Sequence, residues 1–118
     1  MGSDNSPEDL FPSILHVAHD VGEDCILVVL CHDNICRKLK QKVPTTISEK
    51  IQFITAEEIV KMDDAPLLAV RRKKKSSMAL GMRLLNSGEI QAFVSTGNTG
   101  ALVANAAMTL RKLPGIKR

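Results

Sequence analysis

A glycine-rich turn is the part of the sequence best suited to chemistry. It lies in FVSTGNTGALVANAA, residues 93–107, where a β-type segment gives way to a run of small residues. Gly97 and Gly100 carry no Cβ, so an anion could approach the free backbone N–H groups at the positive end of a helix. Asn98 or Thr99 could cap that helix and still offer a side-chain donor. The pattern therefore indicates a phosphate-binding turn.

The same turn also has a purely structural explanation, which the pattern leaves equally open. Glycine could serve the turn geometry, and the alanines could serve close helix packing. Ser95 falls at the carboxyl end of the expected strand, where open α/β sheets bind their ligands. The turn matches neither the dinucleotide motif GxGxxG nor the P-loop motif GxxxxGK[ST], so the sequence supports neither nucleotide site.

A basic run at residues 71–75 carries much of the net charge of +3. This concentration favours a local anionic partner over a wholly basic surface. Arg72, Lys73 and Lys74 are the candidates for contact with an anionic ligand or an acidic carrier protein. The alternative is a solvated loop or helix end. Only 3% of the residues are aromatic, which argues against binding of single-stranded nucleic acid.

The hydropathy pattern and the cysteines bear on location. The longest apolar stretch, residues 25–31, is too short to span a bilayer, and no signal segment opens the chain, so we expect a cytoplasmic protein. Cys25, Cys31 and Cys36 leave one thiol unpaired in any disulfide scheme, and none forms a CxxC pair. We expect two buried strand thiols, a third thiol on a helix, and no metal site.

Periodicity and capping residues predict helices that alternate with strands. Pro7, followed by two carboxylates, starts a helix that Gly22 ends. Short apolar runs predict strands at residues 26–30, 51–54 and 90–94, the first of them buried on both faces. A second helix is expected at 33–39, capped by Asp33 or Asn34, and a short one at 56–62. A further helix is expected at 78–85, capped by Ser76 or Ser77 and ended by residues 86–88. The longest helix is expected at 98–113.

This alternation favours βαβ units, and therefore an α/β fold with a mostly parallel sheet and helices on both faces. The chain has the size of one domain, at 118 residues. It begins, however, at a glycine-bearing loop with no strand before it, and it stops just after a helix. A parallel sheet without its first strand would keep an open edge. We therefore expect residues 1–118 to be the N-terminal fragment of one larger α/β domain.

Four segments, which occur in the same order along the chain as in the family, resemble motifs of the PlsX family of phosphate acyltransferases. STGNTGA at residues 95–101 is similar to the family signature SAGNTGA, and RRKKKSSM at 71–78 is similar to RRKKDSSM. MDDAP at 62–66 is similar to the family loop MDDEP, and MGSDNSP at 1–7 to the family opening MGGDNAP. The resemblance covers essentially the whole chain, but the chain covers only the first part of a typical member.

The resemblance implies a three-layer α/β/α fold related to the isocitrate and isopropylmalate dehydrogenases and to phosphotransacetylase. It implies that a fatty acyl group is transferred from acyl carrier protein to inorganic phosphate, at the entry to bacterial phospholipid synthesis, with no cofactor. We also expect a homodimer when full length and peripheral association with a membrane. The alternative is a non-catalytic fragment or module that binds an anion.

Residue by residue, the resemblance implies a phosphate site on the opening loop and the signature. Asn98 is the catalytic candidate, as a preorganised donor. Asp4 cannot attract phosphate itself, so we expect it to orient donors. The phosphate-binding candidates are Asp4, Asn5, Ser95, Gly97, Thr99 and Gly100.

Three positions depart from the family pattern. Ser3 replaces a glycine, and it would crowd the turn if that position needs positive φ. Thr96 replaces an alanine, which is a mild change, and Lys75 lengthens the basic run. We expect residues 1–118 to be inactive alone, because the downstream part of the family fold should supply the rest of the cleft.

Overall fold

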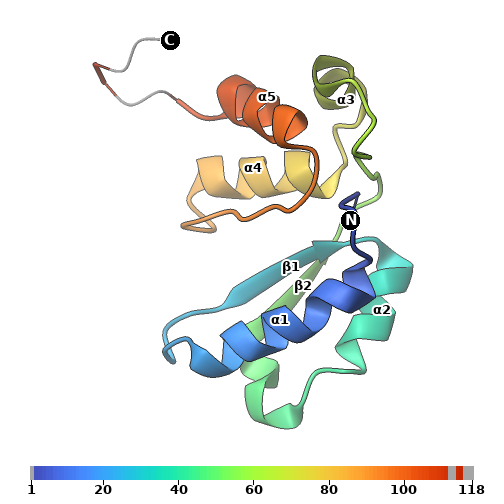
Figure 1. Ribbon diagram of the computed structural model, residues 1–118. Coiled ribbons are helices and arrows are strands. Elements are labelled where there is room, and N and C mark those ends of the chain that lie inside the picture. The colour runs from blue at the N-terminus through green and yellow to red at the C-terminus, as the bar shows by residue number, and fades with distance from the viewer. Residues whose placement is uncertain (1, 112–113, 116–118) are drawn as a thin grey trace.

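The computed structural model describes residues 2–111 and 114–115 as a mixed α/β structure with a small parallel sheet and many helices (Figure 1). Along the chain the elements are α1 (Pro7–Asp20), β1 (Leu27–Cys31), α2 (Asp33–Lys40), the 3-10 helix η1 (Thr45–Lys50), β2 (Ile51–Thr55), α3 (Pro66–Arg72), α4 (Ser77–Ser87) and α5 (Thr99–Thr109). None of the helices among these residues is long and apolar enough to cross a membrane. The predicted α/β class is confirmed.

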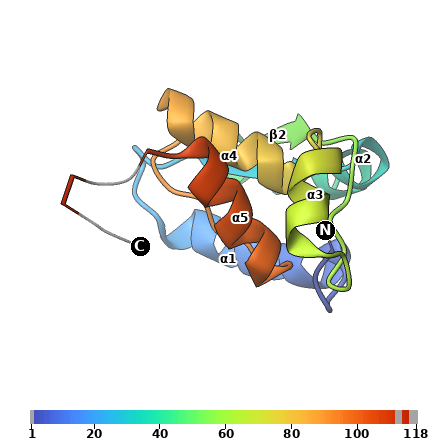
Figure 2. The same ribbon diagram turned by 90° about the horizontal axis from the view of Figure 1, so that it is seen from above.

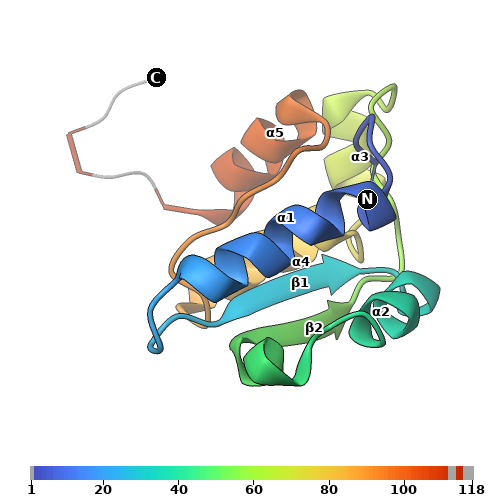
Figure 3. The same cartoon turned by 60° about the horizontal axis from the view of Figure 1, so that its bottom comes forward.

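β1 and β2 pair in parallel, with Leu27 opposite Ile51 and Cys31 opposite Thr55. Parallel strands need a crossover connection, and α2 with η1 supplies it. The predicted βαβ unit is therefore confirmed. Helices lie on both sides of this sheet: Figure 3 shows α1 in front of the strands and α4 behind them. The helix α4 contacts β1 directly.

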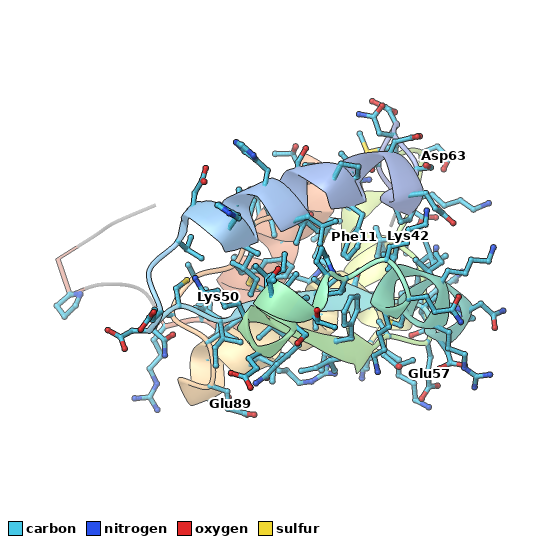
Figure 4. The ribbon with its side chains drawn as sticks, turned by 90° about the horizontal axis from the view of Figure 1, so that it is seen from below. Phe11, Lys42, Lys50, Glu57, Asp63 and Glu89 are labelled. Atoms are coloured by element: carbon cyan, nitrogen blue, oxygen red, sulfur yellow. A yellow bond between two sulfur atoms is a disulfide. The ribbon has the colours of Figure 1, made fainter. Side chains whose placement is uncertain are left out.

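The core beneath α1 joins that helix to one face of the sheet. Its buried centre consists of Ala18 from α1, Ile47 from η1 and Ile51 from β2. Phe11 is only 1% exposed, and its ring centre lies 6.0 Å from that of Phe53 on β2. Figure 4 shows Phe11 directed from α1 toward the sheet. This apolar contact holds α1 against the sheet.

A second core joins α3, α4 and α5 and extends to the segment that follows β2. Its buried members are Val60, Ala69, Met78 and Ala101. The helices α3 and α5 pack directly against each other, as do α4 and α5. This core sets the position of the glycine-rich turn at the start of α5.

The limits of α4 agree with the prediction from sequence. The Ser76 hydroxyl accepts a hydrogen bond from the Ala79 N–H at 3.2 Å, as an N-cap should. Gly88 ends the helix with a φ of +80°, a left-handed conformation that favours glycine. Both ends of α4 are set by residues within one helical turn, so the sequence was sufficient to locate them.

The helix predicted at residues 56–62 is wrong. The Glu57 and Glu58 N–H groups donate to the Lys75 carbonyl oxygen at 3.1 and 3.3 Å, and Glu58 forms an isolated bridge with Ser76. These bonds to a distant part of the chain hold the segment extended, so tertiary contacts override its helical tendency. Pro66 instead starts α3, a helix that the sequence reading missed although proline is common at that position.

The strand predicted at residues 90–94 is also wrong, because the structure assigns no strand there. Phe93 packs against α4: a Cβ added to Gly81 would lie 2.2 Å from the Phe93 ring. With only two strands among the described residues, the sheet is smaller than expected. Most of β1 is therefore only half-buried, and the expectation of a strand buried on both faces is wrong. Ile26, which was expected to begin this strand, lies before it and is exposed.

Two helix boundaries differ from those predicted. His32 occupies the N-cap position of α2, so neither Asp33 nor Asn34 caps it; Asp33 lies in the first turn and pairs with Arg37 at 2.7 Å. The helix α5 ends at Thr109, which makes α1, with 14 residues, longer than α5. The last part of the predicted helix, residues 112–113, lies outside the described residues.

Cys31, buried at the end of β1, and Cys36, on α2, lie in the elements expected for them, but they are not free thiols. Cys31 and Cys36 form a disulfide, with their Cα atoms 5.7 Å apart. The first turn of α2 folds back against the end of β1, and this brings the two sulfur atoms together. Cys25 precedes β1 and is an exposed free thiol, so the expectation that it is buried in a strand is wrong.

Candidate functional site

Three segments that are distant in the sequence meet near the start of α5. They are the opening loop, the segment of residues 59–65, and the glycine-rich turn at 95–100. Gly2 has a φ of +77°, and a Cβ added to it would lie 1.8 Å from the Val60 carbonyl oxygen, so the opening loop packs closely on the middle segment. Figure 2 shows the N-terminus beside α3, at the end of the molecule where α5 begins. In Figure 4 Asp63 lies at this same end.

Asn98 ties the middle segment to the turn. The residue is 6% exposed, and its Oδ1 atom accepts a hydrogen bond from the Ala101 N–H at 2.9 Å, which confirms the predicted cap of α5. Its Nδ2 atom donates to the carbonyl oxygens of Lys61 (3.2 Å), Met62 (3.1 Å) and Asp64 (2.9 Å). An amide nitrogen has only two hydrogens, so both are engaged by the protein. In this arrangement Asn98 holds two segments together.

The backbone of the turn keeps free donors. The N–H groups of Thr99 and Gly100 donate to no described residue, as expected for the first turn of a helix. The Gly97 N–H donates to the Ser95 hydroxyl at 3.2 Å. Because the start of a helix carries a partial positive charge, these free N–H groups could interact with an anion.

Gly100 also has a packing role. A Cβ on this residue would lie 2.7 Å from the Pro66 Cγ atom and 3.3 Å from its Cβ atom. The absence of a side chain therefore allows α5 to approach the start of α3. This contact supports the structural explanation for one of the two glycines of the turn.

The opening loop is exposed at Asp4 and Asn5. The Ser3 hydroxyl donates to the Asn5 carbonyl oxygen at 2.8 Å and so closes the loop on itself. No residue other than glycine has a positive φ among the described residues, so Ser3 does not crowd the turn in the way its replacement of glycine suggested. The position that requires the left-handed conformation is Gly2.

The basic run divides into side chains with different surroundings. Lys73 forms an ion pair with Asp64 and donates to the Ile59 carbonyl oxygen at 2.8 Å. Lys75 pairs with Glu57 at 2.8 Å, and the hydrogen bond that its ammonium group donates to that carboxylate raises the pKa of Lys75. The two other candidates, Arg72 and Lys74, are exposed.

Asp64 is the residue of this region whose role the sequence reading missed. The hydrogen bond from Lys73 lowers the pKa of its carboxyl group, and a second hydrogen bond, from the Lys61 N–H at 2.8 Å, acts in the same direction. Asp64 therefore stays ionised well into the acid range. The available signal was an acidic loop shortly before a basic run, but only the fold shows that Asp64 pairs with Lys73, nine positions further along the chain.

The βαβ unit and the glycine-rich turn at the start of α5 define an α/β protein. A family model described as fatty acid synthesis protein matches residues 1–118, and the chain therefore belongs to that family. The resemblance stated from the sequence motifs is confirmed at this level.

Curated relatives give the family a more particular name. Proteins named phosphate acyltransferase from Thermoanaerobacter pseudethanolicus and Coxiella burnetii are 37% and 36% identical to this chain over 118 residues, and one from Legionella pneumophila is 38% identical. Each alignment covers 100% of this chain and 34% of the relative. The chain thus spans about a third of the length of the relatives it matches.

Proposed function

We propose that this chain is the N-terminal part of a phosphate acyltransferase of phospholipid synthesis. The observation that carries the proposal is the match of all 118 residues to relatives of that name. The free N–H groups at the start of α5 support it, because they suit a bound phosphate. We infer that the rest of the enzyme continues the same domain as a three-layer α/β/α fold of the isocitrate dehydrogenase type.

The proposed reaction moves an acyl group from the thioester of a carrier protein to inorganic phosphate. A phosphate oxygen attacks the thioester carbonyl carbon, a C–O bond forms and the C–S bond breaks. The carrier leaves as a thiolate, which takes up the proton that the hydrogen phosphate gives up. The products are an acyl phosphate and the free carrier thiol. This step needs a positioned, desolvated phosphate and donors for the developing oxyanion, and it needs no redox cofactor or metal.

We assign the phosphate to the portion of the turn that contains Ser95, Gly97, Thr99 and Gly100. Its free backbone donors are the N–H groups of Thr99 and Gly100. Asn98 would act on the reaction by fixing that turn, since its own amide hydrogens are bonded to carbonyl oxygens. Asp4 and Asn5 would approach from the opening loop, with the Asp4 carboxylate orienting donors. These roles remain predictions.

The proposed carrier is acyl carrier protein, which is strongly acidic. Arg72 and Lys74 are exposed and could attract it, or they could add to the field at the phosphate turn. Replacing both with Gln separates these roles when phosphate and carrier are titrated independently. A higher KM for the carrier, with a weaker dependence on ionic strength, assigns them to the carrier; a higher KM for phosphate assigns them to the anion site; no change in either assigns them to solvent.

Formation of acyl phosphate by a full-length protein that carries this segment tests the enzyme proposal. We expect phosphate-dependent release of the carrier thiol by the full-length protein and background release by residues 1–118 alone. The alternative, an anion-binding module without catalysis, predicts phosphate binding without release in both cases. A cytoplasmic location, a homodimer and peripheral attachment to a membrane are further expectations of the same proposal.

A further inference from the structure

The ion pair between Asp64 and Lys73 is set apart from the other charges of the basic run. The Lys73 and Asp64 side chains are 28% and 26% exposed, whereas those of Lys75 and Glu57, the neighbouring pair, are 66% and 65% exposed. Partial exclusion from water strengthens an ion pair relative to a fully exposed one. The Lys73 charge is therefore already matched within the protein.

Lys73 also fixes both ends of one segment. Its ammonium group donates to the Ile59 carbonyl oxygen at 2.8 Å and pairs with the Asp64 carboxylate. The same carboxylate accepts a hydrogen bond from the Lys61 N–H at 2.8 Å. The segment of residues 59–64 is thus folded around a single ammonium group at the end of α3.

The glycine-rich turn is attached to the same segment. Asn98 binds three of its carbonyl oxygens through Nδ2 and caps α5 through Oδ1. A continuous set of contacts therefore runs from Lys73, through residues 59–64 and Asn98, to the free N–H groups of Thr99 and Gly100.

We propose that Asp64 and Lys73 are positioning residues, which hold the 59–64 segment so that Asn98 can set the geometry of the phosphate turn. The part of this inference that concerns phosphate rests on the proposed function. Lys73 then differs from its neighbours Arg72 and Lys74, because it acts on the anion through the segment and not by contact.

A positioning role and a direct role for Lys73 predict opposite effects of Asp64→Asn. If Lys73 contacts phosphate, removal of the carboxylate frees the ammonium group and removes a repulsive charge, so phosphate should bind more tightly. If the pair positions the turn, the same substitution loosens the segment, and phosphate should bind more weakly. A role limited to stability would leave the KM for phosphate unchanged in the folded variant.

The experiment measures two properties of the full-length protein that carries this segment: the KM for inorganic phosphate, and amide exchange by mass spectrometry over residues 59–64 and 97–101. The variants are Asp64→Asn, Lys73→Met and the double substitution. The matched control is Glu57→Gln, which removes the exposed pair of the same type. Lys73→Gln, which can still donate to the Ile59 carbonyl oxygen, replaces Lys73→Met if that variant fails to fold.

We expect each single substitution to raise the KM for phosphate by about tenfold or more, since small displacements of a binding group are costly. Both peptides should exchange faster, the double variant should resemble the singles because the residues act as a unit, and Glu57→Gln should match the wild type. A lower or unchanged KM in Asp64→Asn overturns the proposal. If the activity of the wild type does not depend on phosphate, the proposed function fails. Unchanged amide exchange at residues 97–101 in the variants separately overturns the positioning inference.

Discussion

The side-chain amide of Asn98 donates to the Asp64 carbonyl oxygen at 2.9 Å, across 34 positions of the sequence. The same side chain caps α5 through a hydrogen bond from the Ala101 N–H. The acidic loop and the glycine-rich turn therefore form one structural unit. Any change that separates them should alter both the stability of the chain and the shape of the proposed phosphate site.

Substitution of Asn98 tests this unit. Asn98→Ala removes the helix cap, at a cost of about 1 kcal/mol, and leaves part-buried carbonyl oxygens without a donor, at a further cost of about 1–3 kcal/mol. In a full-length protein, loss of the preorganised turn should lower turnover on the order of a hundredfold. Urea unfolding and an acyl phosphate assay measure the two effects.

Asn98→Asp is the matched control, because aspartate caps helices as well as asparagine does. It should preserve α5 while losing the hydrogen bonds to the 61–64 carbonyl oxygens. Wild-type stability together with wild-type turnover in Asn98→Ala would show that the turn does not depend on this side chain.

Gly100→Ala tests the contact between α5 and α3. The new Cβ would lie 2.7 Å from the rigid ring of Pro66, so we expect overpacking to cost about 1–3 kcal/mol. Alanine regains at most about 1 kcal/mol through its helix propensity, which leaves a net loss of stability. Gly22→Ala is the control, because nothing lies within 4 Å of its added Cβ. A Gly100→Ala variant more stable than the wild type would place Pro66 elsewhere.

The pH dependence of stability tests the ionisation of Asp64. The hydrogen bond from Lys73 lowers its pKa below 3.8 in the folded state, so folding favours the charged carboxylate. The stability that this carboxylate contributes is complete above the unfolded pKa, and it is lost as the pH falls through the lower pKa of the folded state. The difference in unfolding free energy between the wild type and Asp64→Asn should therefore be constant at neutral pH and shrink below pH 3.8. A difference that shrinks as the pH rises would contradict the pairing with Lys73.

Local features of the fold could be predicted from the sequence, and features that depend on distant partners could not. The Ser76 cap, the Gly88 stop and the Asn98 cap follow from side chains and neighbours within one helical turn. Residues 56–62 have a helical pattern, but their backbone pairs with Lys75 and Ser76. Residues 90–94 have a strand pattern, but a strand needs a neighbour to pair with, and none lies beside them among the described residues.

The candidate site shows the same division. The glycine-rich turn and its helix were evident from the pattern, because the glycines and the capping residue are adjacent in the sequence. The acceptors of the Asn98 amide could not be predicted, since they are backbone oxygens of another segment. Nor could the partner of Lys73 be chosen, because Asp63 and Asp64 are equivalent in the sequence and only the fold turns Asp64 toward the ammonium group.

The disulfide predicts a specific thiol count. In denaturant without reductant, one thiol, that of Cys25, should react with a thiol reagent, and three should react after reduction. Reduction should also destabilise the chain by about 2 kcal/mol, the value expected for a short closed loop. Cys25→Ser is the control and should leave no reactive thiol before reduction. Three reactive thiols before reduction would show that Cys31 and Cys36 are not joined.

The fate of labelled inorganic phosphate tests the central claim most directly. A full-length protein carrying this segment is incubated with long-chain acyl carrier protein and radiolabelled phosphate, and the label in acyl phosphate is compared with the carrier thiol released. We predict one labelled acyl phosphate for each thiol released. In Asn98→Ala, the rate of formation of both products should fall by about a hundredfold. Thiol release without labelled acyl phosphate would show that water is the acyl acceptor, and it would contradict the assignment of this chain to a phosphate acyltransferase.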